Sequence, residues 1–149
     1  MKKAAFALAV LLALSACATG YHSSGLTGGL TQTQLSSRVY QVRFQGNGYT
    51  SQERTSVFLL RRCAELTLEN GFRYFSLGPQ GSGSMQSGAS GFIFSFPHGT
   101  ATMKILEKES DDPTPLDAVL VVRDTDKRAG GKLSEKARKT LASFDAPKG

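Results

Sequence analysis

The sequence predicts an α+β fold in which a βαβ unit and a β-hairpin form a three- or four-stranded sheet, with one main helix packed on a face. Three observations lead to this prediction. Apolar and polar residues alternate along residues 39–44, and a long apolar helical pattern follows over 51–69. Residues 92–106 then carry a strand pattern on both sides of a turn that contains glycine.

The first strand and the helix are marked by local signals. Residues 39–44 read as a strand with one buried face. Thr50 and Glu53 match a capping box, so we expect Thr50 to cap a helix that runs to about Glu69. Gly71 suits the left-handed conformation in which helices end.

A second strand is predicted at residues 72–77, directly after the helix. Strand, helix and strand with short loops make a βαβ unit, so its two strands should run parallel with a right-handed crossover. The two strands are either adjacent or separated by another strand.

The next segment is predicted to be a loop followed by a hairpin. Residues 78–91 hold five glycines and four serines, which is typical of a flexible loop. Strands at 92–96 and 100–106 should pair around a turn at 97–99. Their inward side chains should form much of the sheet side of the core: Phe92, Phe94, Phe96, Ala101, Met103 and Ile105.

The C-terminal part contains one ambiguous segment and one clear helix. β-branched residues favour a strand at 118–122, whereas Pro115 at a first helical position favours a helix. Ser134 should cap a short basic helix that runs through Leu141.

The N-terminal residues have the pattern of a bacterial lipoprotein signal peptide. Lys2 and Lys3 precede eleven apolar residues, which span roughly 17 Å as a helix, too short for the ~30 Å hydrocarbon core of a bilayer. Leu14-Ser15-Ala16-Cys17 then resembles the lipobox, in which the cysteine becomes the first mature residue. Small residues before a thiol fit the peptidase and the lipid transfer.

Lipidation at Cys17 predicts a permanent membrane anchor. A covalent diacylglycerol and a fatty acyl chain are expected there, and two or more chains give stable anchoring. No other cofactor is expected. Ala18 follows the cysteine, and the absence of an inner-membrane retention Asp favours the periplasmic face of the outer membrane.

The pattern divides the chain into four parts: a signal peptide at 1–16, the lipidated Cys and a flexible tether at 17–37, a small α+β domain at 38–129, and a basic C-terminal helix and tail at 130–149. The formal net charge is +6, and it falls to +4 without Lys2 and Lys3. The basic residues near the C-terminus would suit an anionic surface, but acidic residues are interleaved with them, which favours an ordinary solvated face. No nucleic-acid partner is expected.

Cys63 is the second cysteine and is left unpaired once Cys17 carries lipid. It lies among apolar helical positions, so we expect it to be buried and inert. Exposure would instead make it reactive, because Arg61 and Arg62 would lower its pKa.

The best candidate site is the turn formed by Gly46, Asn47, Gly48, Thr50 and Ser51. It joins a strand to a helix N-terminus, where free N–H groups favour an anion, but it lacks the lysine of a P-loop. The competing interpretation, which we favour, is a tight structural turn with a cap. No catalytic residue and no metal site is predicted, since the histidines are isolated and the acidic run at 107–112 lacks calcium-loop spacing.

Three segments resemble a family of small proteobacterial lipoproteins of unknown function. They are Gly28-Gly29, the residues 43–51 (RFQGNGYTS) and the residues 62–75 (RCAELTLENGFRYF). The resemblance covers residues 17–77. Members often end in a helical Asp-Ala segment similar to Asp117-Ala118, which implies a helix at 118–122. The basic tail departs from the family pattern, and the family supplies no catalytic residues.

These features predict an outer-membrane-anchored periplasmic lipoprotein that serves as an envelope structural or interaction module. Its partners would be the membrane, through the lipid, and an envelope protein. The alternative is a periplasmic ligand-binding protein or hydrolase that uses the turn from Gly46 to Ser51.

Overall fold

The computed structural model describes residues 21, 28–47, 49–89 and 92–146, with the backbone alone for 79–97. The described part is an α+β fold with a five-stranded antiparallel sheet in the order β1-β2-β4-β3-β5. The strands are β1 (Gly29–Ser36), β2 (Val39–Gln45), β3 (Tyr74–Ala89), β4 (Phe92–Leu106) and β5 (Leu116–Asp117). The helices are α2 (Gln52–Glu69), α3 (Ala118–Ala129), α4 (Glu135–Asp145) and the short 3-10 helix η2 (Glu109–Asp111).

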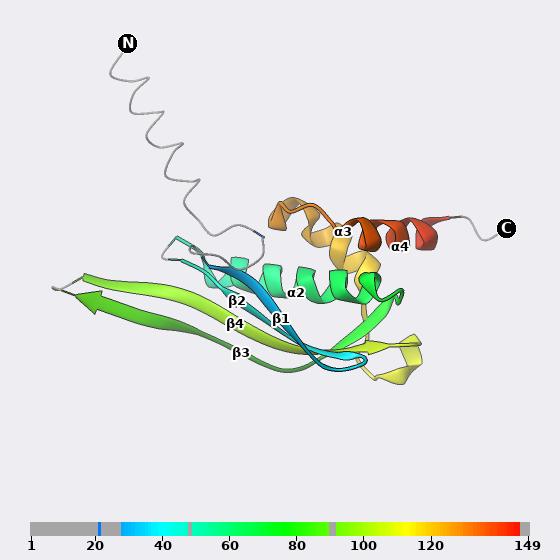
Figure 1. The fold of residues 1–149 in the computed structure, drawn as a ribbon, viewed down its shortest axis with the longest axis horizontal. Coiled ribbons are helices and arrows are strands. Elements are labelled where there is room, and N and C mark those ends of the chain that lie inside the picture. The colour runs from blue at the N-terminus through cyan, green and yellow to red at the C-terminus, as the bar shows by residue number, and fades with distance from the viewer. Residues whose placement is uncertain (1–20, 22–27, 48, 90–91, 147–149) are drawn as a thin grey trace, which may run out of the picture.

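The predicted βαβ unit is confirmed. Strands β2 and β3 both run antiparallel to β4, so they are parallel to each other with one strand between them. The α2 helix connects them and lies on one face of the sheet (Figure 1). This is the second of the two arrangements that the sequence left open.

The helices form a stack on the same side of the sheet, with α3 and α4 on the far side of α2 (Figure 1). Because α2 has neighbours on two sides, most of its length is buried, including Phe58, Cys63 and Leu68. The prediction that Cys63 is buried is confirmed, and burial raises the pKa of its thiol to about 12, which outweighs the opposing effect of Arg62.

The flexible tether predicted for 17–37 is wrong for residues 29–36. These residues form β1, which pairs with β2 along its length. The segment contains no charged residue and little hydrophobic alternation, so the sequence carried no strand signal. Its backbone pairing with β2 supplies the order that its side chains do not. Cys17 and the tether residues 18–20 and 22–27 lie outside the described residues.

The flexible loop predicted for 78–91 is also wrong, because β3 continues to Ala89. The backbone of Gln80 to Ala89 pairs with β4 residue by residue, and this pairing overrides the weak strand propensity of glycine and serine. The register shifts between Leu77 and Gln80, which is where Pro79 lies, as expected for a proline in a bulge. The resulting hairpin extends past the rest of the sheet (Figure 1).

The turn predicted at 97–99 does not exist, because β4 runs unbroken from Phe92 to Leu106. Gly99 serves a different purpose: a Cβ there would lie 2.5 Å from Leu59 Cδ1. The glycine lets α2 approach the sheet closely. Ala101, Met103 and Ile105 are buried as predicted, whereas the side chains of Phe92, Phe94 and Phe96 lie outside the described part.

The ends of the helices lie where local sequence signals predict them, except at the starts of α2 and α3. Gly71 has φ +84°, which confirms the predicted C-cap, and Ser134 caps α4 as expected. The segment 118–122 is helical, as the family resemblance implied. However, α3 begins at Ala118, so Pro115 is not its first residue. Asp117 is the N-cap, and its carboxylate accepts from the N–H of Val119 at 2.8 Å. This carboxylate also accepts from Arg73, which fixes it at the cap.

Candidate functional site

The predicted turn between β2 and α2 is closed by its own polar groups. Asn47 Oδ1 accepts from the N–H of Tyr49 at 3.1 Å and from the hydroxyl of Thr50 at 3.2 Å. The N–H of Thr50 donates to the carbonyl of Asn47 at 3.0 Å. These bonds are those of an Asx-type turn, in which a side chain substitutes for a backbone acceptor.

The cap of α2 lies one residue later than predicted. Ser51 Oγ accepts from the N–H of Arg54 at 3.1 Å, so Ser51 and not Thr50 is the N-cap. Thr50 is buried instead, and its side chain packs against Gly46. A Cβ at Gly46 would lie 2.7 Å from Thr50 Cβ, so this glycine is required for space and not for a positive φ. Gly48 lies outside the described residues.

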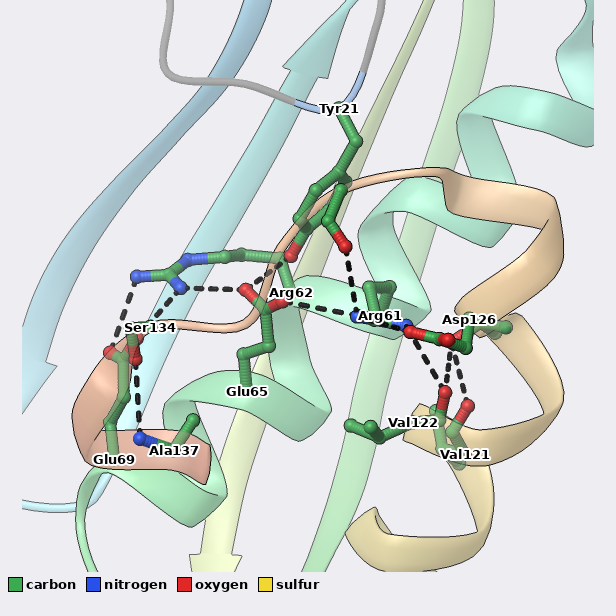
Figure 2. A network of polar contacts seen from close by, with 12 residues as sticks. Tyr21, Arg61, Arg62, Glu65, Glu69, Val121, Val122, Asp126, Ser134 and Ala137 are labelled. Atoms are coloured by element: carbon green, nitrogen blue, oxygen red, sulfur yellow. Dashed lines mark hydrogen bonds and ion pairs between the residues drawn. The ribbon is translucent and has the colours of Figure 1, made fainter. Parts of the chain in front are cut away.

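A larger group of polar side chains lies further along α2, at residues for which no site was predicted. It joins the N-terminal segment, the C-terminal half of α2, α3 and the segment that precedes α4 (Figure 2). We call it the Tyr21 cluster. Its members are Tyr21, Arg61, Arg62, Glu65, Glu69, Asp126 and Ser134.

Arg61 is the centre of the Tyr21 cluster. Its side chain is completely buried, and its guanidinium has hydrogen-bond partners on α2, on α3 and in the segment before α4. It donates to Glu65 Oε1 at 3.1 Å, to Asp126 Oδ1 at 3.1 Å and to the carbonyls of Val122 and Gly131 at 3.1 and 3.4 Å. A buried charge requires such pairing, because desolvation costs several kcal/mol per ion.

Arg62 and Glu69 form the more accessible edge of the cluster. Arg62 donates to Glu65 Oε2 at 2.9 Å, to Glu69 Oε1 at 3.0 Å and to Gln32 Oε1 of β1 at 2.8 Å. Burial lowers the pKa of Arg62, but the charge of Glu69 and the hydrogen bonds to Glu69 and Glu65 act together against it, and the pKa lies above its usual value. Ser134 donates to Glu69 at 2.8 Å while it caps α4.

Tyr21 lies over this cluster and is largely buried. Its hydroxyl donates to Glu65, its ring lies 5.6 Å from that of Phe58 in an edge-on arrangement, and the Arg61 guanidinium lies 5.8 Å from its centroid. Burial first, and then the Glu65 carboxylate, raises the pKa of Tyr21, so the hydroxyl keeps its proton. Gly131 leaves the space for the ring, because a Cβ there would lie 2.3 Å from it.

A cavity of about 470 Å³ opens beside Tyr21, between β1, α2 and the segment before α4. It is lined by Tyr21, Leu30, Gln32, Arg62, Glu65, Glu69, Lys132 and Ser134. The lining carboxylates and the arginine are already paired with one another. The arrangement therefore holds distant segments of the chain together, and its carboxylates and its arginine are satisfied without a ligand, whereas Lys132 forms no ion pair among the described residues.

The described ranges contain neither a metal-binding cluster nor a membrane-spanning helix. No group of three or more histidine, cysteine or carboxylate side chains there is placed to hold a metal ion. No described helix is long and apolar enough to cross a bilayer. Comparison with protein-family models, curated proteins and solved structures finds no match for the chain.

Sequence reasoning missed the Tyr21 cluster because its partners are far apart in the chain. Asp126 lies 65 residues from Arg61, and Glu65 lies 44 residues from Tyr21. One local signal was present: Arg61 and Glu65 are spaced four residues apart within the largely apolar stretch 57–68 of the helix. Charges at such positions indicate a buried ion pair that needs a partner from another element.

Proposed function

We propose that this protein is a lipid-anchored envelope protein of the small proteobacterial lipoprotein type, held on the periplasmic face of the outer membrane through Cys17. The Leu14-Ser15-Ala16-Cys17 motif after a short apolar run supports the anchor. The domain beyond the anchor acts as an interaction module, and its partner is another envelope protein.

The observation that carries the interaction function is the edge strand β1. It pairs with β2 on one side, and no described strand pairs with its outer edge. Residues 31–36 are exposed, and β1 contains no charge and no proline, the usual devices that protect a sheet edge. An extended segment of a partner can add to such an edge through backbone hydrogen bonds.

The alternative, a ligand-binding protein or hydrolase that uses the Gly46–Ser51 turn, has less support. The polar groups of Asn47 and Thr50 bond to each other, and Ser51 occupies one of the free N–H groups of the helix. An anion would have to compete with these bonds.

The anchor is tested by fatty-acid labelling in a Gram-negative host. Wild type should incorporate radioactive palmitate, and Cys17→Ser should lose the label and leave an unprocessed form. Cys63→Ser is the matched control and should keep the label, because Cys63 is buried in the folded domain. Label retained in Cys17→Ser would contradict the anchor.

The strand-addition function is tested by photo-crosslinking in the same cells. A photoreactive residue at Gln34 of β1 should give a discrete crosslinked species, and one at Lys104, exposed on the open sheet face, should not. Adding charge to the edge with Thr33→Lys and Leu35→Lys should remove the species. A crosslink that forms equally from Lys104, or that survives both lysines, would argue against β1 as the docking edge.

A further inference from the structure

Only three residues separate Cys17 from Tyr21, whose ring is packed into the domain. We propose that Tyr21 fixes the orientation of the domain on the membrane, so that the segment before α4 and the outer face of α4 contact anionic phospholipid headgroups. This inference rests on the proposed lipid at Cys17.

The short chain between Cys17 and Tyr21 limits how far the lipid can lie from the domain. Consecutive Cα atoms are 3.8 Å apart, so four steps place Cys17 within about 15 Å of Tyr21. If Tyr21 were released, the next residue that the structure describes is Gly28, and the maximum reach from Cys17 to Gly28 is about 40 Å. The packing of Tyr21 therefore decides whether the lipid is held close to one part of the domain.

Tyr21 is held in the domain through both its hydroxyl and its ring. Its hydroxyl donates to Glu65, which is itself fixed by Arg61 and Arg62. Its ring contacts Phe58 of α2 and fills the space that Gly131 leaves open. The aromatic ring is thus held from one side by α2 and from the other by the segment that leads into α4.

Lysine side chains lie next to Tyr21 and along α4. Lys132 lines the same cavity as Tyr21, and Lys136 and Lys139 follow on the exposed side of α4. Among the described residues, Lys139 pairs with Glu135, while Lys132 and Lys136 have no ion-pair partner. Lysines placed close to a bilayer are attracted to anionic lipids, and this attraction extends only about a Debye length, near 8 Å at physiological salt. Because the reach from Cys17 to Tyr21 is at most about 15 Å, it lets the domain lie against the bilayer with these lysines inside that range.

The test uses the full acylated protein, purified and reconstituted in vesicles of phosphatidylethanolamine and phosphatidylglycerol that contain spin-labelled lipid. A fluorophore is attached at Ala142→Cys on the exposed side of α4, or at Gln45→Cys in β2 as the control on the far side of the sheet. Cys63 is buried and does not compete for the reagent. Mass spectrometry of each sample reports the acyl chains.

The proposal predicts several-fold stronger quenching at position 142 than at position 45. Tyr21→Ala should bring the two values together, whereas Tyr21→Phe, which keeps the ring, should retain most of the difference. Lys132→Glu with Lys136→Glu should weaken quenching at 142, and phosphatidylcholine vesicles should do the same. The matched control, Arg43→Glu with Lys104→Glu, makes the same charge change on the open sheet face and should have little effect.

Equal quenching at both positions in acylated wild type would overturn the orientation while leaving the anchor intact. Lack of an acyl mass would overturn the anchor and this inference together. If Tyr21→Ala fails to fold, the charge variants on the surface still decide the matter. Quenching at position 142 could also stay stronger than at position 45 in the Lys132→Glu, Lys136→Glu variant and in phosphatidylcholine vesicles. This result would show that the contact is not electrostatic and would also overturn the proposal.

Discussion

The turn from Gly46 to Ser51 and the Tyr21 cluster differ in how far their bonds reach along the chain. In the turn, the side-chain bonds join residues two or three positions apart. In the Tyr21 cluster, they join residues 44 to 70 positions apart as well as neighbours on α2. The turn shapes one loop, whereas the cluster determines how three separate segments lie against one helix.

This difference has an energetic consequence. Thr50 is buried, but Asn47 and Ser51 of the turn are partly or fully exposed and can exchange a lost partner for water. Arg61 and Glu65 are buried, so a lost partner leaves a charge without solvent. We therefore expect substitutions in the cluster to cost more free energy of unfolding than substitutions in the turn.

The largest effect is expected for Arg61→Met. The substitution keeps much of the volume but leaves the buried Glu65 without one of its two cations, and it removes the contacts to α3 and to Gly131. Losing one partner of a buried ion pair costs about 3–5 kcal/mol. Urea unfolding followed by circular dichroism measures this loss.

Arg123→Met provides the matched control, because Arg123 forms an exposed pair with Asp145. Such pairs contribute at most about 1 kcal/mol. If the two substitutions had the same small effect, the buried cluster would not be a major source of stability, and the comparison with the turn would fail.

The second effect is the loss of the Tyr21 ring. Tyr21→Ala removes its packing against Phe58 and leaves a space beside Gly131, for which about 3 kcal/mol is expected by analogy with buried aromatic truncations. Tyr21→Phe removes only the bond to Glu65 and should cost about 1 kcal/mol. Thermal unfolding of the mature chain checks both values.

The exposed Tyr49→Ala is the comparison for these variants, and it should leave the melting temperature nearly unchanged. A Tyr21→Ala variant as stable as Tyr49→Ala would mean that the N-terminal segment is not docked in solution. That result would also remove the basis for the membrane orientation.

The same contrast explains what the sequence could predict. β2, α2, the C-cap at Gly71 and the start of α4 at Ser134 were predicted because their signals lie within a few residues of each other. The structural interpretation of the turn was reached from the same kind of signal, although the cap moved from Thr50 to Ser51. Local chemistry was sufficient in each of these places.

The missed features depend on contacts between distant segments. β1 and the end of β3 are strands because a neighbouring strand pairs with them, and their uncharged or glycine-rich residues give no periodic signal. Gly99 resembled a turn residue, yet its role is to make room for Leu59. The Tyr21 cluster was invisible for the same reason, since no short window of sequence contains Tyr21, Arg61 and Asp126 together.

A moderate effect is expected in the turn for Gly46→Ala. The new Cβ would lie 2.7 Å from Thr50 Cβ, so the loop must shift, and overpacking of this kind costs about 1–3 kcal/mol. Gly78→Ala is the control, because its Cβ would lie 3.5 Å from the nearest atom, the carbonyl oxygen of Thr102. Equal stability of the two variants, measured by urea unfolding, would indicate that the turn yields easily and has room for a ligand.

The smallest effect is expected for Ser51→Ala. Ser51 Oγ accepts one hydrogen bond, from the N–H of Arg54, and this group lies at the surface, where water can replace the serine. Losing an N-cap of this kind costs about 1 kcal/mol, which lowers the melting temperature of a small domain by a few degrees. Ser56→Ala is the matched control, because Ser56 is an exposed serine of the same helix that bonds back to the carbonyl of Gln52. Alanine is the better helix former there, so this control should be neutral or slightly stabilising.

A loss at Ser51 no larger than the change at Ser56 would mean that the Arg54 N–H is satisfied without the cap. The N-terminus of α2 would then be free to accept an anion, and the ligand-binding alternative would gain the support that it lacks.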